Sequence, residues 1–285
     1  MHLQGKVCDK MIYEMKYSVL MSVYYKEKTE YLSKSIDSML NQTIAPNEIV
    51  IVKDGPLTDE LDKLIDQYVN KNPLLFKIIK SEVNIGLGRA LNLGLKNCKN
   101  ELVARMDTDD ISFPNRCEKQ LELFKNDKDL VIVGTAIDEF YDNPEEIISS
   151  RVVPDKHERI YEFMKRRSAF NHPTVMYKKS KVLEHGGYAD LKRNQDVDLF
   201  GRMIFSGCKA SNLSESLLLF RSNKDLAKRR KSWENTKSYI NVIKSFWKMG
   251  YSSISDYIIV SLGQSIMFIC PTSVQNWMYK KFLRK

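Results

Sequence analysis

The sequence of 285 residues has no pair of cysteines spaced as CxxC and no run of 18 consecutive apolar residues. The five cysteines are scattered and odd in number, so neither a disulfide framework nor a structural zinc site is expected, and a reducing compartment fits better. Because no such apolar run is present, no transmembrane helix is predicted. Residues 1–16 lack the apolar core of a signal peptide, so we expect the chain to remain in the cytosol.

Glycine and proline are also few, at 12 and 8 residues, and 43% of the residues are apolar. This composition argues against a collagen-like or disordered chain and suffices for one large domain or two closely packed ones. The net charge of +9 is unevenly divided, because residues 1–150 carry −6 and residues 151–285 carry +15. The basic half indicates an anionic partner, either nucleic acid or an anionic membrane surface.

Short apolar runs alternate with helical patterns in the first half of the chain. We predict strands over residues 17–24, 48–53, 76–80 and 102–106, separated by helices over residues 30–41, 59–70 and 88–99. This order predicts a Rossmann-like α/β fold, with a mostly parallel sheet and helices on both faces.

The second half is less regular. We predict helices over residues 116–125 and 196–205 and strands over residues 130–136, 174–177 and 216–220. Residues 138–170 are expected to be mainly loop, and from residue 226 a basic run leads into long helical patterns. No internal repeat or long linker divides the chain.

Polar residues follow the predicted parallel strands where each strand ends. Tyr24, Asp54 and the acidic cluster Asp107-Thr108-Asp109-Asp110 should therefore share one edge of the sheet, where open α/β folds bind ligands. Asp54 alone could simply cap a turn. Three carboxylates within four residues repel one another unless a cation is present, and hard oxygen ligands suit Mg²⁺ or Mn²⁺. A solvated acidic turn is the alternative.

A glycine-spaced turn, Asn84-Ile-Gly86-Leu-Gly88-Arg89, precedes the helix predicted over residues 88–99. No glycine stands three residues after Gly88, so the dinucleotide-binding pattern GxGxxG is not supported. The P-loop pattern is absent as well.

Taken together, these segments resemble family 2 glycosyltransferases, which have the GT-A fold. The resemblance spans residues 17–222 and includes the small bacterial enzymes that build exopolysaccharide, capsule and O-antigen units. Its motifs, in order, are Ser18–Tyr24, Val50–Gly55, Asn84–Asn92, Met106–Asp110, Phe113-Pro114-x-Arg116, Asn171-His172-Pro173, Gly186-Gly187-Tyr188 and Gln195-Asp196-x-Asp198-Leu199.

The resemblance implies a donor site for a nucleotide sugar. Asp54 would bind the nucleotide base, and the turn with Asn84 and Gly86, the Tyr24 region and Arg89 would complete its pocket. Asp107 and Asp109 would form the DxD pair, which binds ribose and holds Mn²⁺ or Mg²⁺ on the diphosphate. The metal would stabilise charge on the departing diphosphate.

Asp196 corresponds to the carboxylate that deprotonates the acceptor hydroxyl in an inverting transferase. The position before it holds Gln195 where the family has Glu, which changes the surroundings of the base. A helix cap is the alternative role for Asp196. His172 could touch the acceptor or be structural.

The resemblance also divides the chain. Residues 1–110 would be the nucleotide-sugar-binding half and residues 111–225 the acceptor-binding half of one GT-A domain. Residues 226–285 would form a helical segment that associates with the membrane. Residues 257–279 contain no charged residue and are flanked by basic ones, a pattern typical of an interfacial anchor, although a helix packed on the domain would share it.

The resulting hypothesis is a metal-dependent, inverting glycosyltransferase that adds a single sugar, because the QxxRW pattern of processive synthases is absent. The donor is expected to be a UDP-sugar and the acceptor a lipid-linked saccharide at the inner membrane face, with no nucleic acid involved. Two alternatives stay open: a nucleotidyltransferase, and a basic nucleic-acid-binding protein. The first lacks its usual glycine-rich basic loop after strand 17–24, and the second lacks aromatics interleaved with the basic residues.

Overall fold

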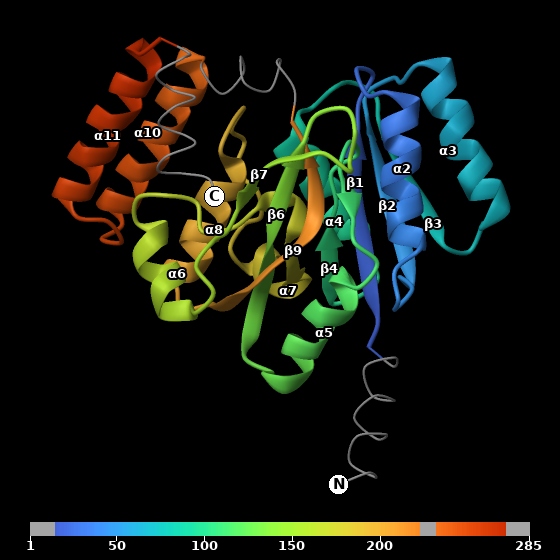
Figure 1. Ribbon diagram of the computed structural model, residues 1–285, viewed down its shortest axis with the longest axis horizontal. Coiled ribbons are helices and arrows are strands. Elements are labelled where there is room, and N and C mark those ends of the chain that lie inside the picture. Colours follow the sequence, from blue (N-terminus) through green and yellow to red (C-terminus); the bar gives the residue numbers. More distant parts are fainter. Residues whose placement is uncertain (1–14, 223–231, 272–285) are drawn as a thin grey trace, which may run out of the picture.

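The computed structural model describes residues 15–222 and 232–271, which form one nine-stranded sheet covered by helices (Figure 1). The strands follow the order β3-β2-β1-β4-β8-β6-β9-β5, and β7 pairs with β6 outside this path. The strands are β1 Tyr17–Val23, β2 Glu48–Asp54, β3 Phe76–Ser81, β4 Leu102–Arg105, β5 Ile111–Ser112, β6 Leu130–Phe140, β7 Ile147–Arg151, β8 Met176–Lys178 and β9 Lys209–Arg221. The helices are α2 Thr29–Leu40, α3 Asp59–Lys71, α4 Leu87–Asn97, α5 Arg116–Asn126, α6 His157–Met164, α7 Lys179–Glu184, α8 Gln195–Phe205, α10 Trp233–Lys248 and α11 Ile254–Ile269.

Strands β1 to β4 are mutually parallel, as predicted, with β1 between β2 and β4 and β3 outside β2. Beyond β4 the sheet is mixed, because β8 runs antiparallel to both β4 and β6 while β6 and β9 are parallel. The predicted α/β fold with helices on both faces is confirmed.

Alternate residues of the central strands enter two different cores. Leu20, Val50 and Val103 face a core that includes residues of α4, α6, α8 and α10. Their neighbours Val19 and Ile51 face a second core with residues of α2, α3 and α5. Burial of both faces explains why these strands are continuously apolar rather than alternating.

Residues 138–170 are more ordered than the predicted loop. They contain the end of β6, the strand β7 and the helix α6, whose Ile160 and Met164 are buried in the first core. The prediction failed there because α6 spans only eight residues and β7 exposes Ile147 and Ile148.

Helices α10 and α11 confirm the helical pattern expected after residue 226. Val242, Ile243 and Phe246 of α10 join the first core. None of the helices in the described ranges is both long and apolar enough to cross a membrane. The basic run Lys228–Lys231 and the tail beyond residue 271 lie outside the described residues.

Candidate active site

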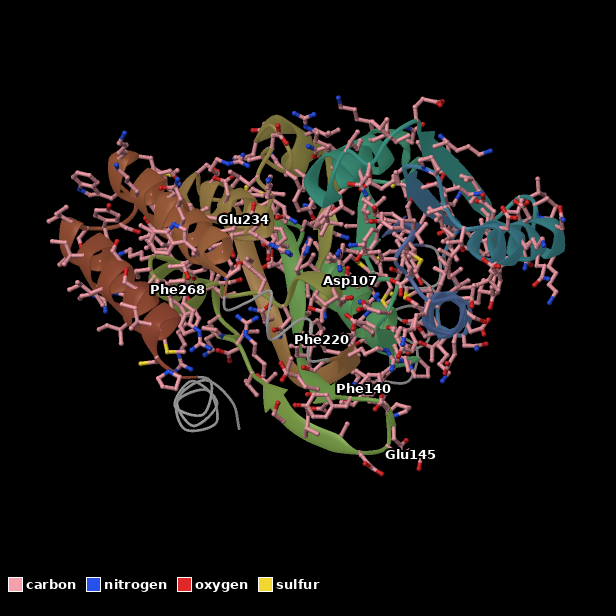
Figure 2. The ribbon with its side chains drawn as sticks, turned by 90° about the horizontal axis from the view of Figure 1, so that it is seen from above. Asp107, Phe140, Glu145, Phe220, Glu234 and Phe268 are labelled. Carbon is pink, nitrogen blue, oxygen red and sulfur yellow. The ribbon has the colours of Figure 1, made fainter. Side chains whose placement is uncertain are left out.

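The predicted donor-binding residues gather at the carboxyl edge of the parallel strands. Asp54 is the last residue of β2, Tyr24 follows β1 directly, and Asp107 stands two residues after β4. Since β2, β1 and β4 are parallel neighbours, these three positions share one edge. Figure 2 views the molecule from above, and Asp107 lies near the middle of that view.

Asp54 forms hydrogen bonds with the glycine-spaced turn at residues 84–89. Its Oδ1 accepts the backbone N–H of Ile85 at 2.7 Å, and its Oδ2 accepts that of Gly86 at 3.1 Å. Asn84 Nδ2 donates to the carbonyl of Asp54 at 3.2 Å. A Cβ at Gly55 would stand 2.7 Å from the backbone nitrogen of Asn84, so only glycine allows the turn to approach this closely. Asp54 thus positions the turn that was predicted to bind the nucleotide.

The acidic cluster brings together carboxylate oxygens of Asp107, Asp109 and Asp110, all within 4.8 Å of one another. Burial, followed by the charges of Asp107 and Glu27, raises the pKa of Asp109 to about 7. Burial and the two neighbouring aspartates raise the pKa of Asp110 well above its usual range. Asp110 Oδ2 is buried and finds no hydrogen-bond partner among the described residues. Clustered carboxylates with an unsatisfied buried oxygen fit a divalent cation such as Mg²⁺ or Mn²⁺.

A buried arginine lies beside this cluster, and sequence reasoning did not find it. Arg105, the last residue of β4, is 1% exposed and forms an ion pair with Asp107. Its Nε and Nη1 have no hydrogen-bond partner within the described part of the chain. An arginine at the end of an apolar strand, directly before an acidic cluster, is the signal that could have found it. Arg105 supplies a fixed positive charge where the donor diphosphate was predicted to bind.

Arg221 on β9 holds the acidic loop from the other side. Its backbone N–H donates to Asp110 Oδ1 at 2.8 Å, and its Nε donates to the carbonyl of Asp109 at 2.9 Å. The guanidinium stacks between the rings of Tyr31, 3.8 Å away, and Phe140, 4.5 Å away. No local pattern predicts this contact, because the two partners are 111 residues apart in sequence.

The loop after β1 contacts the loop after β4. Thr108 donates from its hydroxyl to Glu27, and Ser35 on α2 donates to the carbonyl of Asp107 at 2.6 Å. Tyr24 begins this first loop, with its ring 5.8 Å from that of Tyr25 in an edge contact. These contacts fix the acidic loop against the β1 loop, where the base pocket was predicted.

Arg89, predicted for the same pocket, lies exposed in the first turn of α4. It forms an ion pair with Asp190, in the loop before α8. Arg89 thereby links α4 to the loop before α8.

Asp196 lies in the first turn of α8, and the cap position is held by Asn194, with φ of 59°. Asp196 therefore does not hold the N-cap position, although its carboxylate accepts backbone N–H groups of this first turn. Burial raises the pKa of Asp196, while backbone N–H groups at the helix start and the charges of Arg105 and Arg151 lower it. A carboxylate with a raised pKa is suited to accept a proton near neutral pH. Gln195 is buried, and its Oε1 has no partner among the described residues.

His172 contacts Tyr188 rather than an acid. Its Nε2 lies 3.0 Å from the Tyr188 hydroxyl, which donates to Tyr177 at 3.4 Å. Burial and the charge of Arg105 lower the pKa of His172 well below its usual value, so the imidazole is neutral. This chain of contacts gives His172 a structural partner.

Known proteins resemble this chain over most of its length. A family model described as glycosyl transferase family 2 matches residues 18–187. The UDP-Gal:alpha-D-GlcNAc-diphosphoundecaprenol beta-1,3-galactosyltransferase of Escherichia coli is 35% identical over 95% of this chain and 97% of that protein. The amylovoran biosynthesis glycosyltransferase AmsE of Erwinia amylovora is 32% identical over 93% of this chain and 98% of its own length.

Solved structures share the fold at low sequence identity. S. aureus TarS superposes with a TM-score of 0.62 and 18% identity, covering 94% of this chain and 46% of the TarS chain. The mannosyltransferase PcManGT from Pyrobaculum calidifontis, solved with GDP-Man and Mn²⁺, has a TM-score of 0.62 at 12% identity, covering 93% and 79%. The predicted GT-A fold is confirmed.

Proposed function

Because this chain belongs to glycosyl transferase family 2, we propose that it transfers a single sugar from a nucleotide-sugar donor to a saccharide carried on a lipid diphosphate. The product would be a repeat-unit intermediate of a bacterial surface polysaccharide. Family membership decides in favour of a glycosyltransferase over the nucleotidyltransferase that the sequence left open. The E. coli relative, named for UDP-Gal and for a diphosphoundecaprenol acceptor, supports a UDP-sugar and a lipid-linked acceptor for this chain.

The observation that carries the proposal is the meeting of two sets of residues at one sheet edge. Asp54 holds the glycine turn through Ile85 and Gly86, and the acidic cluster stands two strands away. The turn offers a base pocket, and the cluster offers ligands for a divalent cation on the donor diphosphate. Asp107 and Asp109 are the residues that would hold Mn²⁺ or Mg²⁺.

The transfer uses Asp196 as the base. The acceptor hydroxyl gives its proton to the Asp196 carboxylate while its oxygen bonds to the anomeric carbon of the donor sugar. The bond between that carbon and the diphosphate oxygen breaks, and the nucleoside diphosphate leaves with the electron pair. Attack opposite the leaving group inverts the anomeric centre. The chemistry that a bound divalent cation supplies is stabilisation of the charge on the diphosphate.

Two arginines, Arg105 and Arg221, prepare the site for this step and form no covalent bond in it. Arg105 places a desolvated positive charge beside Asp107 and so favours an anion at the donor site. Arg221 fixes the backbone of Asp109 and Asp110, which keeps the carboxylates at one place before the donor arrives.

Helix α11 supports contact with a membrane surface. Its one charged residue, Asp256, is 6% exposed, whereas six of its apolar side chains are exposed by 48% or more. These are Ile254, Ile258, Ile259, Leu262, Ile266 and Ile269. Such a face suits an interfacial position better than water, and it would bring the enzyme to a lipid-linked acceptor.

The donor site can be tested by thermal unfolding of the full chain with Mn²⁺ and each of UDP, GDP and dTDP. A nucleotide at a hundred times its dissociation constant should stabilise the fold by about 2.7 kcal/mol. We expect stabilisation by UDP that requires Mn²⁺ and is lost in Asp109→Asn. Absence of a response to every nucleotide would overturn the donor assignment.

The transfer is tested with UDP-galactose and N-acetylglucosaminyl diphosphate carrying a long alkyl chain, the acceptor type named in the E. coli relative. We expect a product one hexose heavier in mass spectrometry, and none from Asp196→Asn. GDP-mannose and dTDP-rhamnose serve as the competing donors. No product from any donor would contradict the proposed acceptor class.

A further inference from the structure

Gln195, the first residue of α8, carries a buried amide oxygen that has no hydrogen-bond partner within residues 15–222 and 232–271. The residue is 6% exposed, so water has little access to its side chain. A buried carbonyl oxygen without a donor is unfavourable for the fold, and a ligand that supplies the donor removes this cost. The Gln195 side chain is therefore a candidate to bind a ligand.

The Gln195 side chain packs over the first turn of α4. A Cβ built at Gly88 would stand 3.4 Å from Cγ of Gln195, so the absence of a side chain at position 88 allows this packing. The turn before the same helix binds Asp54 through the N–H groups of Ile85 and Gly86. Gln195 therefore contacts the helix that begins at the turn predicted to bind the nucleotide.

Tyr188 packs on the same turn of α4. Its Cβ would stand 3.5 Å from a Cβ at Gly88. Asn92 of α4 accepts the Tyr188 backbone N–H at 2.8 Å and donates to the Tyr188 carbonyl at 2.7 Å. The Tyr188 hydroxyl contacts Nε2 of His172 at 3.0 Å. Tyr188 thus joins the start of α4 to His172.

His172 belongs to a segment that lies beside the acidic loop. It begins a short 3₁₀ helix, His172–Thr174. Arg116 donates from Nη1 to the carbonyl of Pro173 in this helix at 2.7 Å, and to that of Arg105 at the end of β4 at 3.3 Å. The acidic cluster begins two residues after Arg105. A series of direct contacts therefore connects Gln195 to the nucleotide turn on one side and to the acidic loop on the other.

The start of α8 is held in place by α10. Ser238 donates from its hydroxyl to the carbonyl of Arg193 at 2.7 Å. The Nδ2 group of Asn194 donates to the carbonyl of Asn235 at 3.3 Å. Both contacts fix the backbone directly before Gln195, so its side chain is presented from a supported turn.

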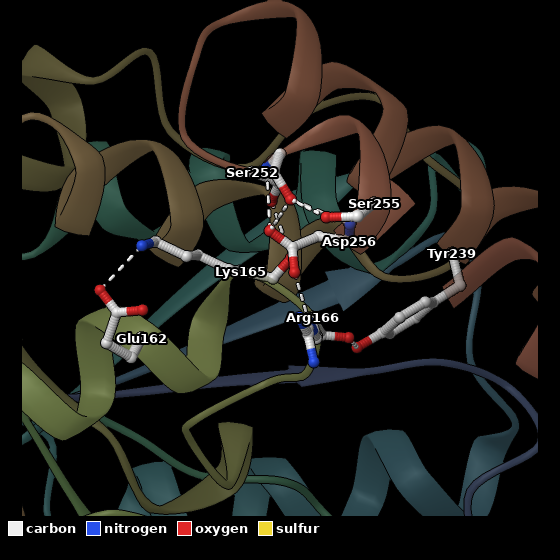
Figure 3. A network of polar contacts seen from close by, with 8 residues as sticks. Glu162, Lys165, Arg166, Tyr239, Ser252, Ser255 and Asp256 are labelled. Atoms are coloured by element: carbon white, nitrogen blue, oxygen red, sulfur yellow. Dashed lines mark hydrogen bonds and ion pairs between the residues drawn. The ribbon is translucent and has the colours of Figure 1, made fainter. Parts of the chain in front are cut away.

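Helix α10 is itself fixed by the polar network of Figure 3. Tyr239 of α10 donates to the carbonyl of Arg166 at 3.2 Å, and Ser252 donates to that of Lys165 at 2.7 Å. Asp256 at the start of α11 pairs with the guanidinium of Arg166. Both C-terminal helices are thereby tied to the loop after α6, and the start of α8 rests against a fixed support.

The group that has to lie in this region during the proposed reaction is the sugar being transferred. Its anomeric carbon must reach both the diphosphate at the acidic loop and the acceptor hydroxyl that Asp196 deprotonates. Asp196 directly follows Gln195. Sugar hydroxyls are neutral hydrogen-bond donors, and an amide oxygen accepts from them without placing a second negative charge beside Asp196.

We infer that Gln195 binds the transferred sugar, with its Oε1 accepting a hydrogen bond from one hydroxyl of the sugar ring, and that it thereby contributes to the choice of donor. The inference rests on the proposed function and adds a residue that selects the sugar. A site that pairs with a hydroxyl rejects a sugar without a hydroxyl at that position, because the oxygen then stays buried without a partner.

Binding to the full chain in the absence of an acceptor tests the inference. Calorimetry with Mn²⁺ compares UDP with UDP-galactose, UDP with UDP-glucose, and GDP with GDP-mannose. Within each pair, the ratio of the two dissociation constants isolates the contribution of the sugar. The pair whose sugar nucleotide the wild-type chain binds most tightly is then titrated into Gln195→Met, Gln195→Asn and Gln120→Met.

Gln120→Met is the matched control. Gln120 on α5 is fully buried, and its Oε1 also lacks a partner among the described residues. Its Nε2, however, donates to the carbonyls of Val133 and Thr174, both at 2.8 Å. This variant should lower the free energy of unfolding and keep the wild-type ratio, because it removes a structural amide.

Both Gln195 variants should weaken binding of the sugar nucleotide about tenfold, because one buried hydrogen bond is lost. The affinity for the free diphosphate should stay within about twofold. Gln195→Asn keeps the amide and draws it back by one methylene, so it tests the position of the oxygen even where the methionine variant folds poorly. An unchanged ratio in the Gln195 variants, or an equal loss for both members of the pair, would overturn the inference.

The same titrations separate this inference from the proposed function. If the wild-type chain binds none of these nucleotides in the presence of Mn²⁺, the donor site fails, and the inference fails with it. If the wild-type chain binds a pair and the Gln195 variants keep its ratio, the assignment of Gln195 is wrong and the proposed function stands.

Discussion

The buried Arg105 forms an ion pair with the half-buried Asp107 at the end of β4, and its guanidinium keeps two nitrogens without partners in the described ranges. A buried charge that is only partly satisfied is costly unless its field is used. Here the field falls on the acidic cluster, in which burial and the charges of neighbouring carboxylates raise the pKa of Asp109 and Asp110. The arginine therefore compensates the same carboxylates that a bound divalent cation would compensate.

Replacement of Arg105 by methionine should make the fold more dependent on metal. In the absence of metal, the free energy of unfolding should fall by about 3 kcal/mol, because the acidic cluster no longer has a cationic partner. Mn²⁺ should then stabilise the variant more than the wild-type chain, since the variant's cluster attracts the cation more strongly. Urea unfolding with EDTA and with Mn²⁺ measures both increments.

Arg116→Met is the matched control for Arg105. Arg116 is as fully buried, but it donates to the carbonyls of Pro173 and Arg105 and lies outside the acidic cluster. The variant Arg116→Met should have a lower free energy of unfolding than the wild-type chain, and Mn²⁺ should not restore it. If Mn²⁺ stabilises Arg105→Met no more than it stabilises the wild-type chain, Arg105 and the metal do not compensate the same carboxylates.

Asp54→Asn should weaken donor binding. An amide has one acceptor oxygen, so the N–H of either Ile85 or Gly86 loses its partner and the turn loosens. The lost charge-assisted hydrogen bond is worth about 1.5–3 kcal/mol, and the donor KM should rise about tenfold or more while the acceptor KM stays the same. Steady-state kinetics check this. Glu82→Gln, an exposed acid near the same turn, should behave as wild type.

The parallel half of the fold, β1 to β4, could be predicted because its signals are local. Strands β1, β2 and β4 are buried and largely apolar, Asp54 ends β2, and Asp107 stands two residues after β4. Parallel pairing then places both residues at one edge without further information. Arg105 was missed although it stands in the same run, because a charge inside a strand pattern was read as part of the strand.

The part of the fold after β4 could not be predicted to the same depth, since its secondary structure depends on strand pairing and core contacts rather than on local sequence patterns. Strand β9 extends to Arg221 by pairing with β6 through three register shifts, and half of its residues are polar or exposed. Arg221 reaches Asp110 only in that pairing. Helix α6 is similar, because just two of its residues are buried and its stability depends on the core it covers.

Gly201→Ala should weaken the packing of α10 against α8. A Cβ at Gly201 on α8 would stand 2.0 Å from Cζ of Phe246, which is fully buried on α10. Overpacking of this kind costs about 1–3 kcal/mol, and the companion change Phe246→Leu should return part of it. Gly263→Ala on α11 is the control, because its Cβ would meet nothing within 4 Å among the described atoms. That change should stabilise the chain by about 0.5–1 kcal/mol, and equal losses at the two glycines would refute the contact.

The pH dependence of transfer should show Asp196 acting as a base. Burial raises its pKa above the ordinary value of 3.8, so the ionised form that accepts the proton is lost as pH falls through this raised value. The acid limb of kcat/KM should therefore lie above the range of an exposed aspartate. Arg151 lowers the same pKa by its charge, so Arg151→Met should move the limb to higher pH. Lys181→Met, which removes an exposed cation from α7, should leave the limb in place. A limb that does not respond to Arg151→Met would assign the titration to another group.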